Sequence, residues 1–405
     1  MQIGIIGGGA AGLMAAIQAH QPGIEVQVFD ANASSGRKLS TTGAGRCNIS
    51  NRSANADAYF TDNSAALKTC FESKPNLEVL KTLESIGIPT TASEDGWIYP
   101  LSFSAANVVG IMENNLKGIP FFHNTLITGI QKTEKGFILS TADRTQQYTA
   151  DKIIVACGSP ANPQLGARGD LYQPLENLGH TLLPVRPALT PIETDAVLFH
   201  KLQGVRLDAE ISLVRDKRVI ARTIGNIIIT QWGINGPGVM NISHLIDPQH
   251  PGLYSLKINF APNFSDAIRN SFMNSGLQDL SLSSILKGFF PAKIVDFLLR
   301  QTDLAQIKTC KELSNKHKEL LLKTIQAQEI TVRGVRGFKH AQASTGGIAL
   351  SDIDPHTMES RICKGLFFAG EILNVLGPCG GFNLHWAFLS GILAARGIIR
   401  SQTKI

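Results

Sequence analysis

The chain has 405 residues, 43% of them hydrophobic and 17% charged, which excludes a disordered protein and allows two or three domains with a large core. The 38 Lys and Arg exceed the 32 Asp and Glu, and this net charge of +6 predicts a weak attraction to polyanions. The six cysteines show no CxxC pair or regular spacing, which argues against a disulfide framework or a metal site and favours a cytoplasmic protein.

No apolar run reaches the roughly 20 residues that a membrane helix needs, and no basic leader precedes the first apolar run. We therefore expect neither a membrane span nor a signal peptide.

The first thirty residues predict a βαβ unit that binds a dinucleotide. In chain order they contain a strand over Gln2–Ile6, a Gly-x-Gly-x-x-Gly turn, a helix over Leu13–His20 and a strand over Glu25–Asp30. Gly7 permits a tight turn, Gly9 lets the backbone approach a pyrophosphate, and Gly12 lets helix and strand pack closely. Asp30 stands where a carboxylate accepts hydrogen bonds from an adenosine ribose, which disfavours NADP. The alternative is a Gly-rich turn that binds no ligand.

Two distant segments decide between NAD and FAD, because an extended FAD is held from several parts of the chain. An apolar strand from Lys152 ends in Ala156-Cys157-Gly158, where small residues can approach a cofactor. A second apolar strand, from Lys364, leads to a Gly-rich turn and a helix that starts near Asn383. The N–H groups at the start of that helix would place positive potential on an anionic flavin edge. These segments favour FAD.

The middle of the chain predicts an insertion in the cofactor domain. Short alternating runs such as AEISLVR and YSLKINF indicate strands, whereas ILKGFFPAKIVDFLLRQ and KHKELLLKTIQAQ have helical spacing. We expect a discontinuous FAD-binding domain of residues 1–187 and 335–405, a β-rich subdomain of residues 188–263 and a helical subdomain of residues 264–334. The fold class is α/β, with a Rossmann-like domain interrupted by the insertion.

Six segments carry a family resemblance: GIIGGGAAGLMAA, GRKLSTTGAGRCNISN, LGARGDLYQPLENLGH, IITQWGINGPGVMNIS, ASTGGIALSDIDPHTMES and GLFFAGEILNVLGPCGGFNLHWAFLSG. In this order they resemble the HI0933-like flavoproteins, which implies a glutathione-reductase-like FAD-binding domain and non-covalent FAD. The contacts that the resemblance implies are Gly7, Gly9, Ala11, Gly12, Asp30, Arg37, Lys38, Ile127, Gly370, Glu371, Gly381, Phe382 and Asn383. The chain departs from the family pattern at Gln231, Asn235 and Asn374, where His, Ser and Asp are common.

The residues predicted nearest the flavin ring suggest who handles the proton. A thiol of Cys47 or Cys379 could act as general acid, protonating the carbon opposite the one that receives hydride; each is otherwise a small buried residue. His340 and His385 are further candidates for proton transfer, or else structural. Arg46 either neutralises a phosphate or a flavin carbonyl, or solvates its loop.

Two kinds of further contact are expected. Ala156 and Gly158 should contact the cofactor at the end of their strand. Arg333, Arg336 and Lys339, in VRGVRGFKH, are predicted to contact a phosphate-bearing substrate, as are the lysines of the helical segment. The alternative for all these cations is an ordinary solvated surface.

Three functions remain open. The resemblance points to ribosomal RNA dihydrouridine synthesis, in which flavin reduces the C=C bond of uridine. The second is a small-molecule flavoenzyme, either an amine oxidase or an enoyl- or steroid-type reductase. The third is a flavin-containing ribosome-binding protein without turnover. No second Gly-x-Gly-x-x-Gly turn follows a strand, so NAD(P)H would serve only as a transient reductant, or a reduced partner would replace it.

Overall fold

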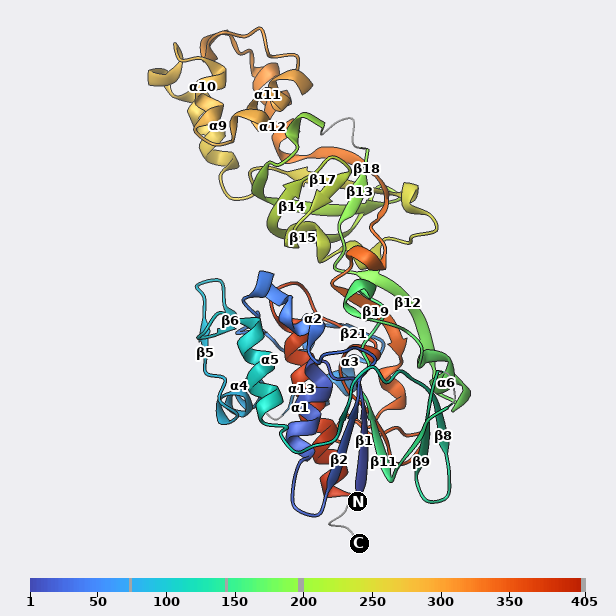
Figure 1. Ribbon diagram of the computed structural model, residues 1–405. Coiled ribbons are helices and arrows are strands. Elements are labelled where there is room, and N and C mark those ends of the chain that lie inside the picture. The colour runs from blue at the N-terminus through green and yellow to red at the C-terminus, as the bar shows by residue number, and fades with distance from the viewer. Residues whose placement is uncertain (73–74, 143–144, 196–199, 402–405) are drawn as a thin grey trace. The chain divides into compact units, whose positions relative to one another are not determined.

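The computed structural model describes residues 1–72, 75–142, 145–195 and 200–401 (Figure 1). Residue contacts divide the chain into two units, one formed by Met1–Ala188 with Ala341–Ile405 and the other by Leu189–His340.

A five-stranded parallel sheet forms the centre of the first unit, in the order β20-β11-β1-β2-β7. Its strands are β1 (Gln2–Ile6), β2 (Glu25–Phe29), β7 (Phe121–Phe122), β11 (Lys152–Val155) and β20 (Leu366–Phe368). The central strands are apolar along their whole length, as expected of a sheet covered on both faces. This sheet confirms the predicted Rossmann-like fold class.

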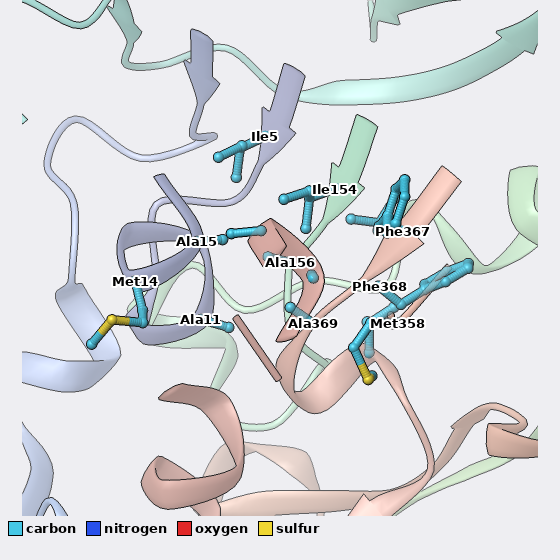
Figure 2. Close-up of a cluster of buried hydrophobic side chains, with 14 of the residues drawn as sticks. Ile5, Ala11, Met14, Ala15, Ile154, Ala156, Met358, Phe367, Phe368 and Ala369 are labelled. Carbon is cyan, nitrogen blue, oxygen red and sulfur yellow. The ribbon is translucent and has the colours of Figure 1, made fainter. Parts of the chain in front are cut away.

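Helices α1 (Ala10–Ala19) and α13 (Phe382–Arg400) pack against each other beside this sheet (Figure 1). A Cβ on Gly391 would lie 2.5 Å from the carbonyl oxygen of Ala11, so only glycine permits this approach. Figure 2 shows Ala11, Ala15 and Ala156 in the core beneath, with Phe367 and Phe368 of β20. The small residues set the distance between helix and sheet, and the large ones fill the remaining space.

Shorter elements complete the first unit. Its helices are α2 (Arg37–Ser40), α3 (Ser64–Cys70), α4 (Pro75–Ser85), α5 (Ala105–Asn114) and α6 (Tyr172–Asn177). Its antiparallel strands are β8 (Ile127–Lys132), β9 (Phe137–Thr141) and β10 (Gln147–Ala150) in one sheet; β3 (Ser50–Asn51), β5 (Thr90–Ala92) and β6 (Trp97–Pro100) in another; and the pairs β12 (Leu182–Ala188) with β19 (Ala343–Ile348) and β4 (Phe60–Thr61) with β21 (Val375–Leu376).

The second unit contains a closed barrel in the order β13-β16-β15-β14-β17-β18. Its strands are β13 (Ile192–Thr194), β14 (Arg206–Arg215), β15 (Arg218–Ile229), β16 (Gly233–Asn235), β17 (Tyr254–Asn259) and β18 (Gln328–Val335), and the short helix α8 (Pro237–Met240) packs on β15. Alternate residues of β17 are buried, the pattern of a strand with one face toward a core. The barrel confirms the predicted β-rich part.

The helical part follows β17 and consists of α9 (Ser265–Met273), α10 (Leu282–Lys287), α11 (Ala292–Gln301) and α12 (Asn315–Gln326). The expected helical range, 264–334, runs past α12. Residues from Gln328 onward form β18, whose buried Ile330 and Val332 alternate with exposed residues. Because β18 pairs with both β13 and β17, it closes the barrel.

Helix α13 is the one helix in the described part of the chain that is long and apolar enough to cross a membrane by length and composition. In its most apolar window 67% is buried inside the structure. Its contacts with α1 and α4 explain its apolar composition as that of a core helix.

Candidate functional site

The Gly-rich turn joins β1 to α1 and has the geometry of a phosphate cradle. A Cβ on Gly12 would lie 1.8 Å from the carbonyl oxygen of Gly7, and one on Gly7 would lie 2.4 Å from that of Ala156. In contrast, a Cβ on Gly9 would meet nothing within 4 Å. Gly7 and Gly12 therefore serve internal packing, whereas Gly9, the N-cap of α1, faces open space at the helix N-terminus.

A pocket of about 440 Å³ opens beside this turn. It brings together three residues predicted from the sequence, Gly7, Asp30 and Ile127. One Asp30 carboxylate oxygen accepts from the Gly8 N–H at 2.6 Å, and the other accepts from the Asn32 N–H at 2.7 Å. Since each carboxylate oxygen has two lone pairs, Asp30 fixes the turn and can still accept from a ribose.

The sequence did not single out the rest of this pocket. Its other lining residues are Phe29, Ala31, Asn32, Thr125, Leu126, Cys157, Gly166, Arg168, Asp170 and Leu171. Several lie in LGARGDLYQPLENLGH, a segment that carried the resemblance. Its Gly and charged residues were the available signal, but no local pattern placed them beside the Gly-rich turn.

A second group of predicted residues is joined by Glu371, which follows β20. One of its carboxylate oxygens accepts from Lys38 Nζ at 2.7 Å, and the other from Ser159 Oγ at 2.9 Å and the Ser344 N–H at 2.8 Å. The Glu371 side chain therefore ties α2, the turn after β11 and β19 together. Arg37, next to Lys38, donates to Asn32 Oδ1 at 3.0 Å and so borders the pocket.

The small residues of this region leave room beside the same turns. Ala156 lies at the end of β11, and a Cβ on Gly158 would meet nothing within 4 Å. A Cβ on Gly370 would lie 2.9 Å from Cβ of Ala11, so Gly370 packs against α1.

The loop from Thr42 to Asn48 holds Cys47 in a strained conformation. Cys47 has φ of 61° and Ala44 has φ of 55°, in the left-handed region that non-glycine residues rarely adopt. Cys47 is fully buried, and burial raises the pKa of its thiol to about 11. The Arg46 guanidinium lies over the Tyr99 ring, 5.4 Å from its centroid.

The turn from Gly377 to Gly381 lies against this loop. Asn51 Nδ2 donates to the Gly380 carbonyl at 3.0 Å, and a Cβ on Gly381 would lie 2.3 Å from the Ser50 carbonyl oxygen. Asn383 holds the turn in shape by bonding both the N–H and the carbonyl of Gly377 at 2.9 Å. The structure therefore brings the two segments predicted nearest the flavin ring together.

Cys379 lies in that turn and, unlike Cys47, is partly exposed. Surrounding atoms raise the pKa of its thiol to about 12, so the thiol is protonated at neutral pH. A general acid must hold its proton and reach the substrate. Of the two cysteines, Cys379 meets both conditions. Phe382 follows as the first residue of α13, and its carbonyl accepts from Tyr59 Oη at 2.9 Å.

His385 is buried in the first turns of α13. Its Nδ1 lies 2.9 Å from Ser50 Oγ, and its Nε2 has no partner among the described residues. Burial lowers its pKa to about 4, so the ring is neutral at pH 7 and links α13 to β3.

This burial predicts an acid-dependent loss of stability. The ordinary pKa of histidine, 6.5, applies in the unfolded chain, so the unfolded chain binds a proton first. The free energy of unfolding should fall by roughly 3 kcal/mol as pH drops from about 6.5 to about 4. The variant His385→Gln should lose this part of the pH dependence, measured by denaturant unfolding at both ends of the range. An unchanged pH dependence would contradict the assignment.

The remaining predicted residues belong to the second unit. Arg333 Nη2 lies 3.0 Å from Asp195 Oδ2. Arg336 has its guanidinium 4.5 Å from the Trp232 ring centroid and an Nη2 2.8 Å from His340 Nε2. Both arginines are thus held by neighbours, and Lys339 is exposed beside them. Burial, followed by the charges of Arg336 and Lys339, lowers the pKa of His340.

The departures from the family pattern have local explanations at two positions. Asn374 Oδ1 accepts from the Gly346 N–H at 2.9 Å while its Nδ2 donates to Asp62 Oδ1 at 3.0 Å. An ionised aspartate there would lack the donor. Asn235 Oδ1 accepts from the Gly236 N–H at 2.8 Å. Gln231 is exposed, and nothing in the structure explains its identity.

The first unit fits FAD by its own geometry. It offers a cradle open at Gly9, a pocket that contains an acidic residue at the end of β2, and two buried side-chain atoms without partners among the described residues, Tyr172 Oη and Asn162 Oδ1. Within the described ranges no group of three or more His, Cys, Asp or Glu could hold a metal ion, and all six cysteines are free.

Comparison with known proteins agrees with this geometry. Residues 1–397 match the sequence model of the family described as "HI0933-like protein Rossmann domain". The chain is 34% identical, over 98% of both chains, to the 3-dehydro-bile acid delta(4,6)-reductase of Clostridium scindens. It is 29% identical, over 98% of both chains, to the ribosomal RNA dihydrouridine synthase of Haemophilus influenzae.

A solved structure shares the fold. It is the 3-ketosteroid-delta4-(5alpha)-dehydrogenase of Rhodococcus jostii, with a TM-score of 0.51 and 13% identity, over 98% of this chain and 96% of that one. From the family match and the cofactor geometry, the chain belongs to the HI0933-like family and is an FAD-dependent oxidoreductase.

Proposed function

We propose that this protein reduces a C=C bond conjugated with a carbonyl group, and that its substrate is a uridine of ribosomal RNA. The observation that carries the substrate class is the distribution of charge. Residues 189–340 contain 19 Lys and Arg against 13 Asp and Glu, and the rest of the chain contains 19 of each, which together give the 38 and 32 of the whole. The entire net charge of +6 therefore belongs to the second unit.

A concentrated positive charge supports an RNA substrate on physical grounds. RNA phosphates attract Lys and Arg without regard to sequence, and the released counterions make such binding fall steeply with salt. In α12 the cations are Lys316, Lys318 and Lys323, and Lys316 and Lys323 are fully exposed. A uridine in folded RNA must also leave its stack to reach a flavin, and contacts to flanking phosphates would offset that cost.

The residues of the first unit divide the chemistry as follows. FAD bound there supplies the hydride that the reduction needs. The Cys379 thiol gives its proton to C5 of uridine, the carbon next to the C4 carbonyl, while C6 receives the hydride. Cys47 shapes the loop, since it is fully buried with no ligand present. His385 stays neutral and holds the start of α13 in place.

The test measures dihydrouridine in ribosomal RNA from a deletion strain of the source organism, its parent and complemented strains. The wild-type gene should restore a dihydrouridine that deletion removes. The triple variant Lys316→Glu, Lys318→Glu, Lys323→Glu should restore much less, and its RNA binding should depend less on salt, by up to about 0.7–0.9 in log–log slope per lost contact.

The control is the triple variant Lys81→Glu, Lys117→Glu, Lys135→Glu, which changes three exposed cations of the first unit by the same charge. It should restore dihydrouridine fully. Unchanged dihydrouridine on deletion, or equal loss with both triple variants, would contradict RNA as the substrate recognised by the second unit.

A second candidate substrate is an unsaturated steroid-type ketone. The similarity to the bile acid delta(4,6)-reductase, at 34% identity over nearly the whole chain, favours it. The chemistry would be the same, because its C=C bond is also conjugated with a carbonyl. A deletion strain with unchanged dihydrouridine, together with rapid reduction of such a ketone by the purified protein, would establish this alternative.

A further inference from the structure

Tyr172, the first residue of α6, carries a hydroxyl that the described residues leave without a hydrogen bond. The side chain is 7% exposed, and its Oη is buried with no partner. An unpaired buried hydroxyl costs about 1–3 kcal/mol, so such groups normally have a partner. Burial raises the pKa of Tyr172 well above its usual range, and the charges of Cys157 and Glu371 raise it further, so the hydroxyl keeps its proton.

The position of this hydroxyl points to the cofactor site. The preceding residue, Leu171, lines the pocket that contains Gly7 and Asp30, as does Cys157. A Cβ on Gly347 would lie 3.5 Å from Tyr172 Oη, so the hydroxyl reaches β19. It therefore lies between the pocket and the segments that Glu371 joins.

A second buried atom on the same segment lacks a partner. Asn162 Oδ1, between Cys157 and Tyr172 in the chain, is also buried without a hydrogen bond from the described residues. The same segment lines the pocket with Cys157, Gly166, Arg168, Asp170 and Leu171. Two unpaired polar atoms on one pocket-lining segment indicate that the missing partner is a ligand.

We propose that Tyr172 Oη donates a hydrogen bond to the bound FAD and is a cofactor-binding residue. This proposal rests on FAD binding and not on the choice of substrate, so it stands or falls separately from the proposed function.

The test is Tyr172→Phe, with Tyr59→Phe as the matched control. Tyr59 is equally buried, at 8% exposed, but its hydroxyl already donates to the Phe382 carbonyl. The FAD dissociation constant, measured by equilibrium dialysis of the holoenzyme, should rise about five- to tenfold for Tyr172→Phe. Tyr59→Phe should leave it within about twofold, and should instead lower the unfolding temperature at saturating FAD.

Two results would overturn the proposal. One is an unchanged FAD dissociation constant in Tyr172→Phe, which would assign the hydroxyl to water. The other is failure of Tyr172→Phe to fold, because removal of a hydroxyl that has no protein partner should not cost the apoprotein stability.

Discussion

Gly12→Ala is expected to prevent stable FAD binding. A Cβ at this position would lie 1.8 Å from the carbonyl oxygen of Gly7, far inside van der Waals contact. Because the obstacle is backbone, no side-chain rotation relieves it, and β1 and α1 must separate. The purified variant should contain little or no flavin by its visible absorbance and should unfold at a lower temperature.

Two alanine variants serve as controls. Gly110→Ala, in α5, meets nothing within 4 Å and should bind FAD normally, with equal or slightly greater stability. Gly9→Ala also meets nothing within 4 Å of its Cβ. It should keep its fold, by far-UV circular dichroism, yet bind FAD more weakly, because this space is where we place the pyrophosphate. A Gly12→Ala protein with full flavin content would contradict this account of the turn.

Cys379→Ala is expected to slow product formation by roughly 10²–10⁴-fold, the usual contribution of a general acid. The FAD content and visible spectrum should stay unchanged, because the change removes a thiol and leaves the glycines of the turn in place. Since the pKa of the thiol is raised to about 12, the wild-type rate should not fall between pH 7 and 9 through ionisation of this group. Both quantities are measured by anaerobic mixing of substrate with reduced holoenzyme.

The matched control is Cys47→Ala. Cys47 is fully buried, so its loss should lower stability while the folded variant keeps its rate within about tenfold. Full activity of Cys379→Ala, or a rate loss confined to Cys47→Ala, would assign the proton to another group.

The fold of the first unit could be predicted because its signals are local. The three glycines, the apolar strands and Asp30 each report a steric or electrostatic demand within a few residues of chain, and the structure has β1, α1 and β2 at the expected places. The barrel was harder to bound. β18 follows the helices in sequence but pairs with β13 and β17, and such distant pairing leaves no local mark beyond the alternation of Ile330 and Val332.

The site was predictable only in part for a related reason. Cys47 and Cys379 have similar sequence surroundings, but only packing shows that one is buried and the other partly exposed. Likewise Tyr172 looks like an ordinary helix residue until its hydroxyl is found to lack a partner. Predictions for Arg333 and Arg336 treated them as free cations, whereas Asp195 and Trp232 already hold their guanidinium groups.

The central claim is that the bound flavin reduces a conjugated C=C bond of uridine in RNA. The most direct measurement mixes photoreduced holoenzyme, without oxygen, with ribosomal RNA from the deletion strain, and follows both flavin absorbance and nucleoside mass. The account predicts that the oxidised flavin spectrum returns as one dihydrouridine forms per flavin. A flavin that stays reduced in the presence of this RNA, with no dihydrouridine formed, would contradict it.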